Sequence, residues 1–166
     1  LVQQLQSRTV SRRYVAVVCG ALKGSGTVDA PIGRDPAHRT RMAVLGKHST
    51  VAKEAITHYQ VKEAFDHFTL VTLKLETGRT HQIRVHMSHL GFGLVGDATY
   101  RGKPLKTSEI RPSVLETVNN FGRQALHARE LGLIHPATGK SCSWRAPMPD
   151  DLEQLIEQLR EEDTWH

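Results

Sequence analysis

The sequence predicts an α+β fold, with a mixed, largely antiparallel sheet and flanking helices. Residues 14–19 and 68–76 are apolar runs rich in β-branched side chains, which are typical of buried strands. The short segment 65–67 separates two strand-like runs, as in an antiparallel hairpin. Residues 81–90 and 150–162 repeat apolar side chains at helical spacing, which predicts two amphipathic helices.

The other elements are weaker and are predicted from alternation, turn residues and proline. Short or alternating segments predict further strands at 41–45, 54–64, 124–135 and 141–146. Residues 1–7 resemble the end of a helix, and 112–121 form a weaker helix candidate. Residues 31–39 hold two prolines and a glycine, which predicts irregular structure.

Length and composition indicate one globular domain. A chain of 166 residues can bury a real core, and 39% hydrophobic with 23% charged residues is a globular composition. No apolar run approaches the roughly 20 residues of a membrane span, and no signal peptide is visible. Cys19 and Cys142 lack metal-ligand spacing, which favours free thiols in a reducing, cytoplasmic setting but leaves one disulfide open.

Charge is unevenly distributed along the chain. The last 18 residues hold seven acidic residues and one arginine, so their net charge is −6. Because the whole chain has a net charge of +5, the other residues carry +11. A basic body with an acidic terminal helix favours a polyanionic partner such as RNA. A basic protein without such a partner is the alternative.

Residues 76–87 are the most informative segment. A strand pattern runs into Gly78 and then into a short helix pattern that carries Arg79 and Arg84. Glycine permits a tight strand-to-helix turn, and the start of a helix offers free backbone N–H groups. The segment therefore predicts an anion site, with an ordinary turn bearing solvated charges as the alternative.

Other common chemistries find little support in the sequence. The chain holds no phosphate-binding Gly-x-x-x-x-Gly-Lys loop and no Gly-x-Ser-x-Gly nucleophile elbow. His81, His86 and His89 cluster, but no acidic residue lies among them, so we expect core or RNA-facing histidines and no metal. A metal-dependent hydrolase is the alternative, and it predicts bound zinc.

Six segments together resemble the RNA pseudouridine synthases that modify ribosomal RNA, in particular the bacterial branch acting on large-subunit RNA. In chain order these are RRYVAVVCG at 12–20, GTVDAPIGR at 26–34, LETGRTHQIRVHM at 75–87, HLGFGLVGDATY at 89–100, RQALHARELGLIHPATG at 123–139 and APMPDDL at 146–152. The resemblance covers nearly the whole chain. It implies the catalytic fold of that family.

The resemblance implies an isomerisation of uridine in RNA, which breaks the N1–C1′ bond and rejoins the base through C5. The target base must leave its stack, so the site needs basic residues for the backbone and an aromatic face for the base. A carboxylate with a cationic partner and a base for the C5 proton complete the requirement. Neither a metal nor an organic cofactor is implied, and the implied partner is large-subunit ribosomal RNA.

The resemblance also implies roles for single residues. Tyr14 matches the active-site tyrosine that stacks on the base, and Arg84 matches the arginine that pairs with the catalytic aspartate. Ile83 matches an apolar position that packs against the base. A core tyrosine, an exposed helical arginine and plain core packing are the respective alternatives.

Two further groups are expected to contact RNA. The turn ahead of the predicted helix supplies Arg79, Thr80, His81 and Gln82. A basic loop supplies Arg34, Arg39, Arg41 and Lys47, for which a solvated charged loop is an equal alternative.

One departure from the family pattern matters. The family carries its catalytic aspartate in an Arg-Leu-Asp segment before the tyrosine strand, and these 166 residues contain no such segment. We therefore expect residues 1–166 to be the C-terminal part of one catalytic domain, truncated at its N-terminus and inactive alone. The alternative is a non-catalytic RNA-binding module derived from the family.

Overall fold

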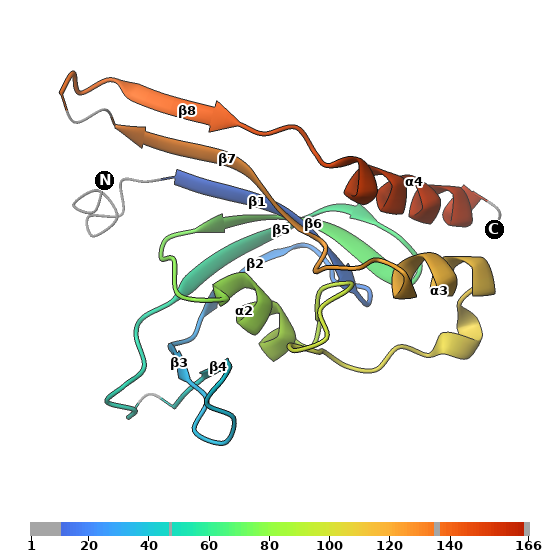
Figure 1. The fold of residues 1–166 in the computed structure, drawn as a ribbon, viewed down its shortest axis with the longest axis horizontal. Coiled ribbons are helices and arrows are strands. Elements are labelled where there is room, and N and C mark those ends of the chain that lie inside the picture. The colour runs from blue at the N-terminus through green and yellow to red at the C-terminus, as the bar shows by residue number, and fades with distance from the viewer. Residues whose placement is uncertain (1–10, 47, 135–136, 165–166) are drawn as a thin grey trace.

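A six-stranded sheet forms the centre of the computed structural model, which describes residues 11–46, 48–134 and 137–164 (Figure 1). Its strand order is β2-β5-β6-β1-β7-β8. The strands are β1 (Ser11–Cys19), β2 (Ser25–Asp29), β5 (Ile56–Ala64), β6 (Phe68–Leu75), β7 (Leu126–Ile134) and β8 (Ser141–Arg145). Every neighbouring pair is antiparallel, which confirms the predicted fold class.

A hairpin and the helices complete the fold. Strands β3 (Ile32–Arg34) and β4 (Met42–Val44) form a separate two-stranded sheet. The helices are α2 (Gln82–Leu90), α3 (Pro112–Asn119) and α4 (Asp150–Thr164), with a 3₁₀ turn η1 (Thr107–Glu109). The prediction of irregular structure over 31–39 was wrong at residues 32–34. These residues lie between the two prolines, and their backbone pairs with β4. The predicted helix end at 1–7 lies outside the described residues.

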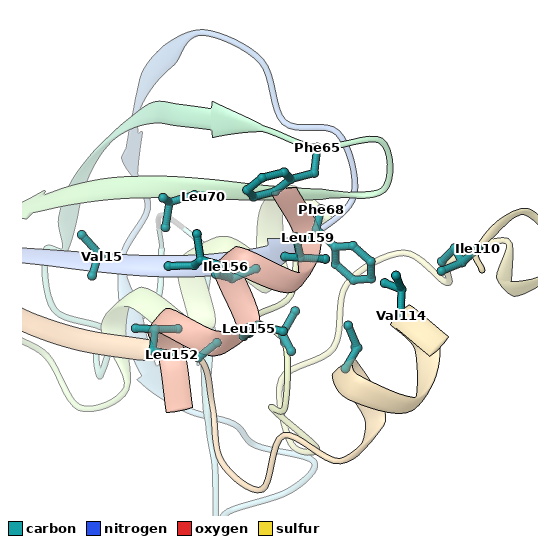
Figure 2. Close-up of a cluster of buried hydrophobic side chains, with 14 residues drawn as sticks. Val15, Phe65, Phe68, Leu70, Ile110, Val114, Leu152, Leu155, Ile156 and Leu159 are labelled. Carbon is teal, nitrogen blue, oxygen red and sulfur yellow. The ribbon is translucent and has the colours of Figure 1, made fainter. Parts of the chain in front are cut away.

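Helix α4 covers one face of the sheet. Its Leu152, Leu155, Ile156 and Leu159 are at most 3% exposed and belong to one core with β1 and β6 (Figure 2). Val15 and Val17 supply the β1 side of this core, because alternate side chains of a strand point to opposite faces. Burying these side chains fixes α4, and with it the acidic C-terminal segment, on the face away from α2.

Helix α2 covers the opposite face. Ile83 and Met87 are buried against Ala16 and Val18 of β1 and against strand β6. The helix ends at Gly91, whose φ of 97° closes it with hydrogen bonds to the carbonyls of Met87 and Ser88. The predicted helical face is confirmed. This packing fixes the start of α2 beside the first half of β1.

Two smaller findings bear on the sequence predictions. Cys19 and Cys142 are free cysteines, and burial raises the pKa of the Cys19 thiol to about 11, so that sulfur stays protonated at neutral pH. None of the helices in the described ranges is long and apolar enough to cross a membrane. The extent of the domain stays a prediction.

Candidate active site

A cavity of about 310 Å³ lies where β1, the start of α2 and the end of β6 meet. This volume is near the lower end of the ~300–1,000 Å³ of small-molecule sites. Tyr14, Ile83 and Arg84 all line it, although some 70 positions separate the tyrosine from the other two. Leu75 and Leu126 add apolar surface. The fold thus brings together the three residues that were singled out for catalysis and base packing.

Strand alternation places Tyr14 at the cavity. Its neighbours Arg13 and Val15 belong to the other face of the sheet, while Tyr14 packs with the core beneath α2. The pairing of β1 with β7 shifts register between Arg13 and Tyr14. The extra residue at this shift is Arg129 of β7, whereas β1 pairs with β6 without a shift, so the alternation along β1 is unbroken. The half-buried Tyr14 therefore lines the cavity on the α2 face of the sheet.

The turn ahead of α2 is built differently from its prediction. The left-handed residue is His81, with φ 55° and ψ 26°, and no positive φ occurs at Gly78. Gly78 instead provides space, because a Cβ there would overlap Nη1 of Arg12. The glycine is therefore required by a neighbouring guanidinium, a reason that only the folded structure reveals.

Gln82 holds this turn in place. Its side chain is 3% exposed, and its Oε1 accepts hydrogen bonds from the Thr77 hydroxyl at 2.7 Å and the Arg79 N–H at 3.0 Å. Its Nε2 donates to the Ile56 carbonyl and to the Thr57 hydroxyl. These four bonds use the whole amide, so Gln82 joins the turn to β5. The predicted contact of Gln82 with RNA stays a prediction.

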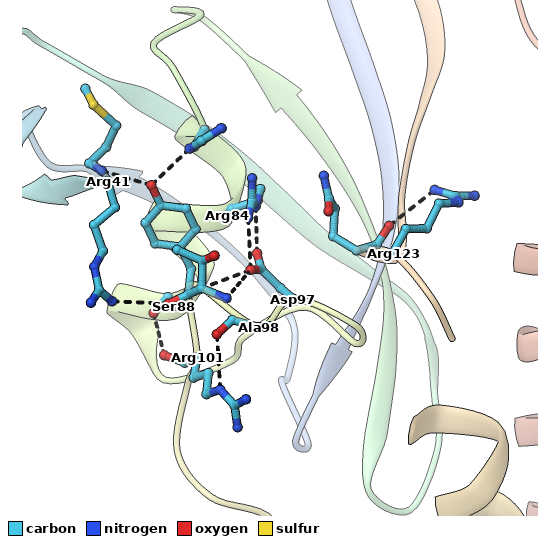
Figure 3. Close-up of polar contacts among 12 residues, drawn as sticks. Arg41, Arg84, Ser88, Asp97, Ala98, Arg101 and Arg123 are labelled. Atoms are coloured by element: carbon cyan, nitrogen blue, oxygen red, sulfur yellow. Dashed lines mark hydrogen bonds and ion pairs between the residues drawn. The ribbon is translucent and has the colours of Figure 1, made fainter. Parts of the chain in front are cut away.

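Arg84 is held by a carboxylate that the sequence reasoning assigned no role. Its Nε donates to Oδ2 of Asp97 at 2.7 Å and its Nη2 to Oδ1 at 3.0 Å, a bidentate pair (Figure 3). The Arg84 guanidinium carbon also lies 4.8 Å from the centre of the Tyr100 ring. The hydrogen bond to Asp97 raises the pKa of Arg84, which keeps the guanidinium charged at the cavity wall.

Asp97 is fixed as tightly as its partner. Burial opposes its ionisation, but the hydrogen bonds from Arg84 and from the backbone N–H groups of Tyr100 and Thr99 outweigh it, so its pKa lies below the ordinary value. Its side chain is 0% exposed. A carboxylate so enclosed orients Arg84 and cannot reach a substrate in the cavity.

The loop after α2 delivers Asp97 to this position. Val95 donates its N–H to the Val17 carbonyl of β1, and the chain then turns at Gly96 with φ 80°. A Cβ at Gly96 would overlap the Arg123 carbonyl. Residues 91–96 spell Gly-x-Gly-x-x-Gly, but dinucleotide sites place this motif between a strand and a helix. Here it follows a helix and serves the turn.

Tyr100 connects the β3–β4 hairpin to the site. Its hydroxyl accepts a hydrogen bond from the Met42 N–H at 2.9 Å and lies 2.9 Å from Nδ1 of His81. Having accepted from Met42, the hydroxyl can donate to His81, whose pKa is lowered by burial and by the nearby Arg84 charge. Sequence reasoning missed this role; the only signal was the position of Tyr100 in a family-like segment.

The other predicted binding residues divide between the cavity and its surroundings. Arg79 and His81 line the cavity, whereas Thr80 is exposed and does not. In the hairpin, Arg34 donates to the Arg39 carbonyl at 2.6 Å. Arg41 donates to the Thr99 carbonyl at 3.5 Å and lines a separate pocket of about 540 Å³. The hairpin arginines therefore lie outside the cavity, and Lys47 lies outside the described residues.

The histidines do not form a metal centre in the described part of the chain, where no three His, Cys, Asp or Glu residues are placed to hold an ion. His86 is 0% exposed and is satisfied within the core. Its Nε2 donates to the Ala30 carbonyl at 2.9 Å, and its Nδ1 accepts from the Thr57 hydroxyl at 2.7 Å. This pattern fits the neutral ring.

Comparison with known proteins finds a matching family model and similar sequences. A sequence model of the family described as RNA pseudouridylate synthase matches residues 1–89, more than half of the chain. The ribosomal large subunit pseudouridine synthase D of Pseudomonas aeruginosa is 49% identical over 98% of this chain, and that of Escherichia coli K12 is 46% identical over 100%. The chain spans about half the length of these relatives, 49% and 50% respectively.

Two solved human structures are also similar. RNA Pseudouridylate Synthase Domain Containing 4 has a TM-score of 0.75 and 25% identity, covering 96% of this chain and 66% of that one. RNA Pseudouridylate Synthase Domain Containing 1 has a TM-score of 0.70 and 27% identity, covering 96% and 69%.

Proposed function

The chain belongs to the RNA pseudouridylate synthase family, and from this membership we propose that it forms the nucleotide-receiving part of an isomerase that converts uridine to pseudouridine in large-subunit ribosomal RNA. The observation that carries the proposal is the cavity shared by Tyr14, Ile83 and Arg84. It offers an aromatic ring, an apolar side chain and a fixed cation to an extruded base. Such an enzyme would work in the cytoplasm of a bacterium.

The reaction exchanges one glycosidic bond for another within the same nucleotide. The C1′–N1 bond breaks, the C1′–C5 bond forms, N1 gains a proton and the proton on C5 is removed. Tyr14 would stack on the uracil and stand close to the C5 proton, and Ile83 would pack against the base. Arg84 would hold an incoming carboxylate through the part of its guanidinium that faces the cavity, with Asp97 fixing its orientation.

The carboxylate required by this chemistry has no candidate at the cavity. None of the described residues that line it is acidic, and Asp97 is enclosed behind Arg84. We therefore assign the reacting carboxylate to an Arg-Leu-Asp segment outside residues 1–166, as the family pattern implies. On this proposal the 166-residue chain does not isomerise uridine by itself.

Adding the segment tests the proposal. The half of the P. aeruginosa relative that the chain does not match would be fused ahead of Leu1, and pseudouridine would be mapped in large-subunit RNA. The fusion should form pseudouridine, whereas the chain alone, and fusions with Tyr14→Phe or Arg84→Met, should form little or none. A fusion that binds the RNA without forming product would favour the non-catalytic RNA-binding module instead.

A further inference from the structure

Among the described residues that line the cavity, Arg12 has a role in neither the proposed chemistry nor the folded core. It lies on β1, two residues before Tyr14 and on the same face of the sheet, and it lines the same cavity. Its Nε is buried and has no hydrogen-bond partner. The side chain is therefore not held by a hydrogen bond at Nε, and the part of the guanidinium that lines the cavity is open to a ligand.

The charges around the cavity show which kind of group fits. Three arginines line it, and Asp97 balances the charge of Arg84. Arg79 donates its Nε to the carbonyl of Glu54 at 2.7 Å, which orients it without neutralising it. No acidic side chain is among the described lining residues. The cavity is therefore positively charged beside Arg12, which selects an anion.

The position of the guanidinium is fixed by the backbone. Its Nη1 lies against Gly78, where a Cβ would overlap it. Arg12 pairs with Leu75 of β6 on one side and with Leu131 of β7 on the other, so its strand is held from both edges. The planar fork is thus presented from a rigid strand, an arrangement suited to the oxygens of a phosphate.

From these observations we propose that Arg12 binds a backbone phosphate of the RNA next to the nucleotide whose base stacks on Tyr14. The proposal deepens the function proposed above and rests on it. Two residues on one face of a strand lie about 7 Å apart, a separation that one nucleotide can bridge between base and phosphate. Arg12 would thereby fix the position of the RNA backbone.

The test uses the 166-residue chain and the RNA trinucleotide UpUpU. Binding is followed by NMR through the Nε–H signals of the arginines, and the phosphate on either side of the central uridine is replaced in turn by an uncharged methylphosphonate. The Arg12 signal should shift on binding. Neutralising one of the two phosphates should weaken binding roughly tenfold, as expected for a hydrogen bond to a charged group.

Variants then assign the loss to Arg12. Arg12→Met should weaken binding about as much as the methylphosphonate, and the two changes together should cost little more than either alone. Arg13→Met is the matched control, because Arg13 carries the same charge on the opposite face of the strand. Gly78→Ala keeps the charge but displaces the guanidinium, and it should weaken binding as well.

Each outcome decides between the proposals. Three results would overturn the role of Arg12 and leave the proposed function standing. These are equal effects of Arg12→Met and Arg13→Met, additivity of Arg12→Met with both methylphosphonates, or an Arg12 signal that does not move. If UpUpU does not bind the unaltered chain, the nucleotide-receiving cavity itself is refuted, and this inference with it.

Discussion

The position of Arg84 at this site depends on a partner residue that does not itself contact the cavity. Its guanidinium is 15% exposed, and Asp97 behind it is fully enclosed. The pair is closer to a buried ion pair than to a surface one, so removing one member leaves a charge with little solvation. Asp97 therefore positions Arg84, and its loss should affect both folding and the site.

Asp97→Asn tests this dependence. We expect the free energy of unfolding to fall by about 3 kcal/mol, because the Arg84 charge stays buried without its partner. Urea denaturation would measure the change. Asp151→Asn is the control, since Asp151 makes a similar bidentate pair with Arg123 at the surface and should change stability little. Equal losses in the two variants would contradict a positioning role for Asp97.

His86 predicts how stability depends on pH. Burial lowers the pKa of its ring below the ordinary value of about 6.5. The unfolded chain therefore binds the proton more readily than the folded one, so this contribution is complete above about pH 6.5 and is lost as pH falls toward the lowered pKa. Unfolding at pH 7.5 and 5.5 should show the loss.

The same experiment on variants separates His86 from its neighbours. His86→Gln should lower stability at pH 7.5 and reduce the difference between the two pH values, because the titrating ring is gone. His38→Gln is the control and should leave that difference unchanged, since His38 is exposed between β3 and β4 and is not among the groups that lower the pKa of His86. His81 adds an effect of the same sign, because its pKa is also lowered.

At the scale of elements, the Tyr100 hydroxyl links the β3–β4 hairpin to the start of helix α2, next to the apolar contacts that Val85 makes with the hairpin. Tyr100 accepts the Met42 N–H of β4 and lies against His81 at the start of α2, while Arg84 packs on its ring. The hairpin that carries Arg34 and Arg41 is thereby joined to the cavity wall. An RNA bound by the hairpin would therefore be held at a fixed position relative to the cavity.

Tyr100→Phe tests this connection. Removing the hydroxyl keeps the ring beneath Arg84 but leaves the Met42 N–H without its acceptor, so we expect the hairpin to loosen while Arg84 stays paired. Hydrogen exchange at Met42 should accelerate by about tenfold, the equivalent of one hydrogen bond. Tyr59→Phe, on the sheet face beneath α2, should leave that amide unchanged. Unaltered exchange in Tyr100→Phe would disprove the connection.

At the scale of the whole molecule, the sheet separates the large apolar core from the cavity. One face carries α4 and the large apolar core, whereas the other carries α2 and the cavity. Strand β1 contributes to both, with Val15 and Val17 on the core side and Arg12 and Tyr14 on the cavity side. The basic cavity and the acidic α4 therefore lie on opposite faces, which keeps the acidic residues away from an approaching polyanion.

The sequence by itself determined the fold class, most strands, the three helices and several of the residues that line the cavity. Continuous apolar runs and an apolar period of 3.6 residues are local properties, and they were sufficient for β1 and β6 and for α2 and α4, respectively. It failed at β3, whose three residues are strand only because β4 lies beside them. Tyr14, Ile83 and Arg84 were found through a resemblance that runs along the chain in order.

Only the tertiary structure decided which charges meet. The pairing of Arg84 with Asp97, the space that Gly78 leaves for Arg12, and the left-handed turn at His81 each depend on segments that are distant in sequence or on the closure of a loop. The sequence specifies the charge of each side chain. It does not specify the distance to the partner charge or the amount of water between the two. Those two quantities set the energy of a charge pair, and folding fixes them.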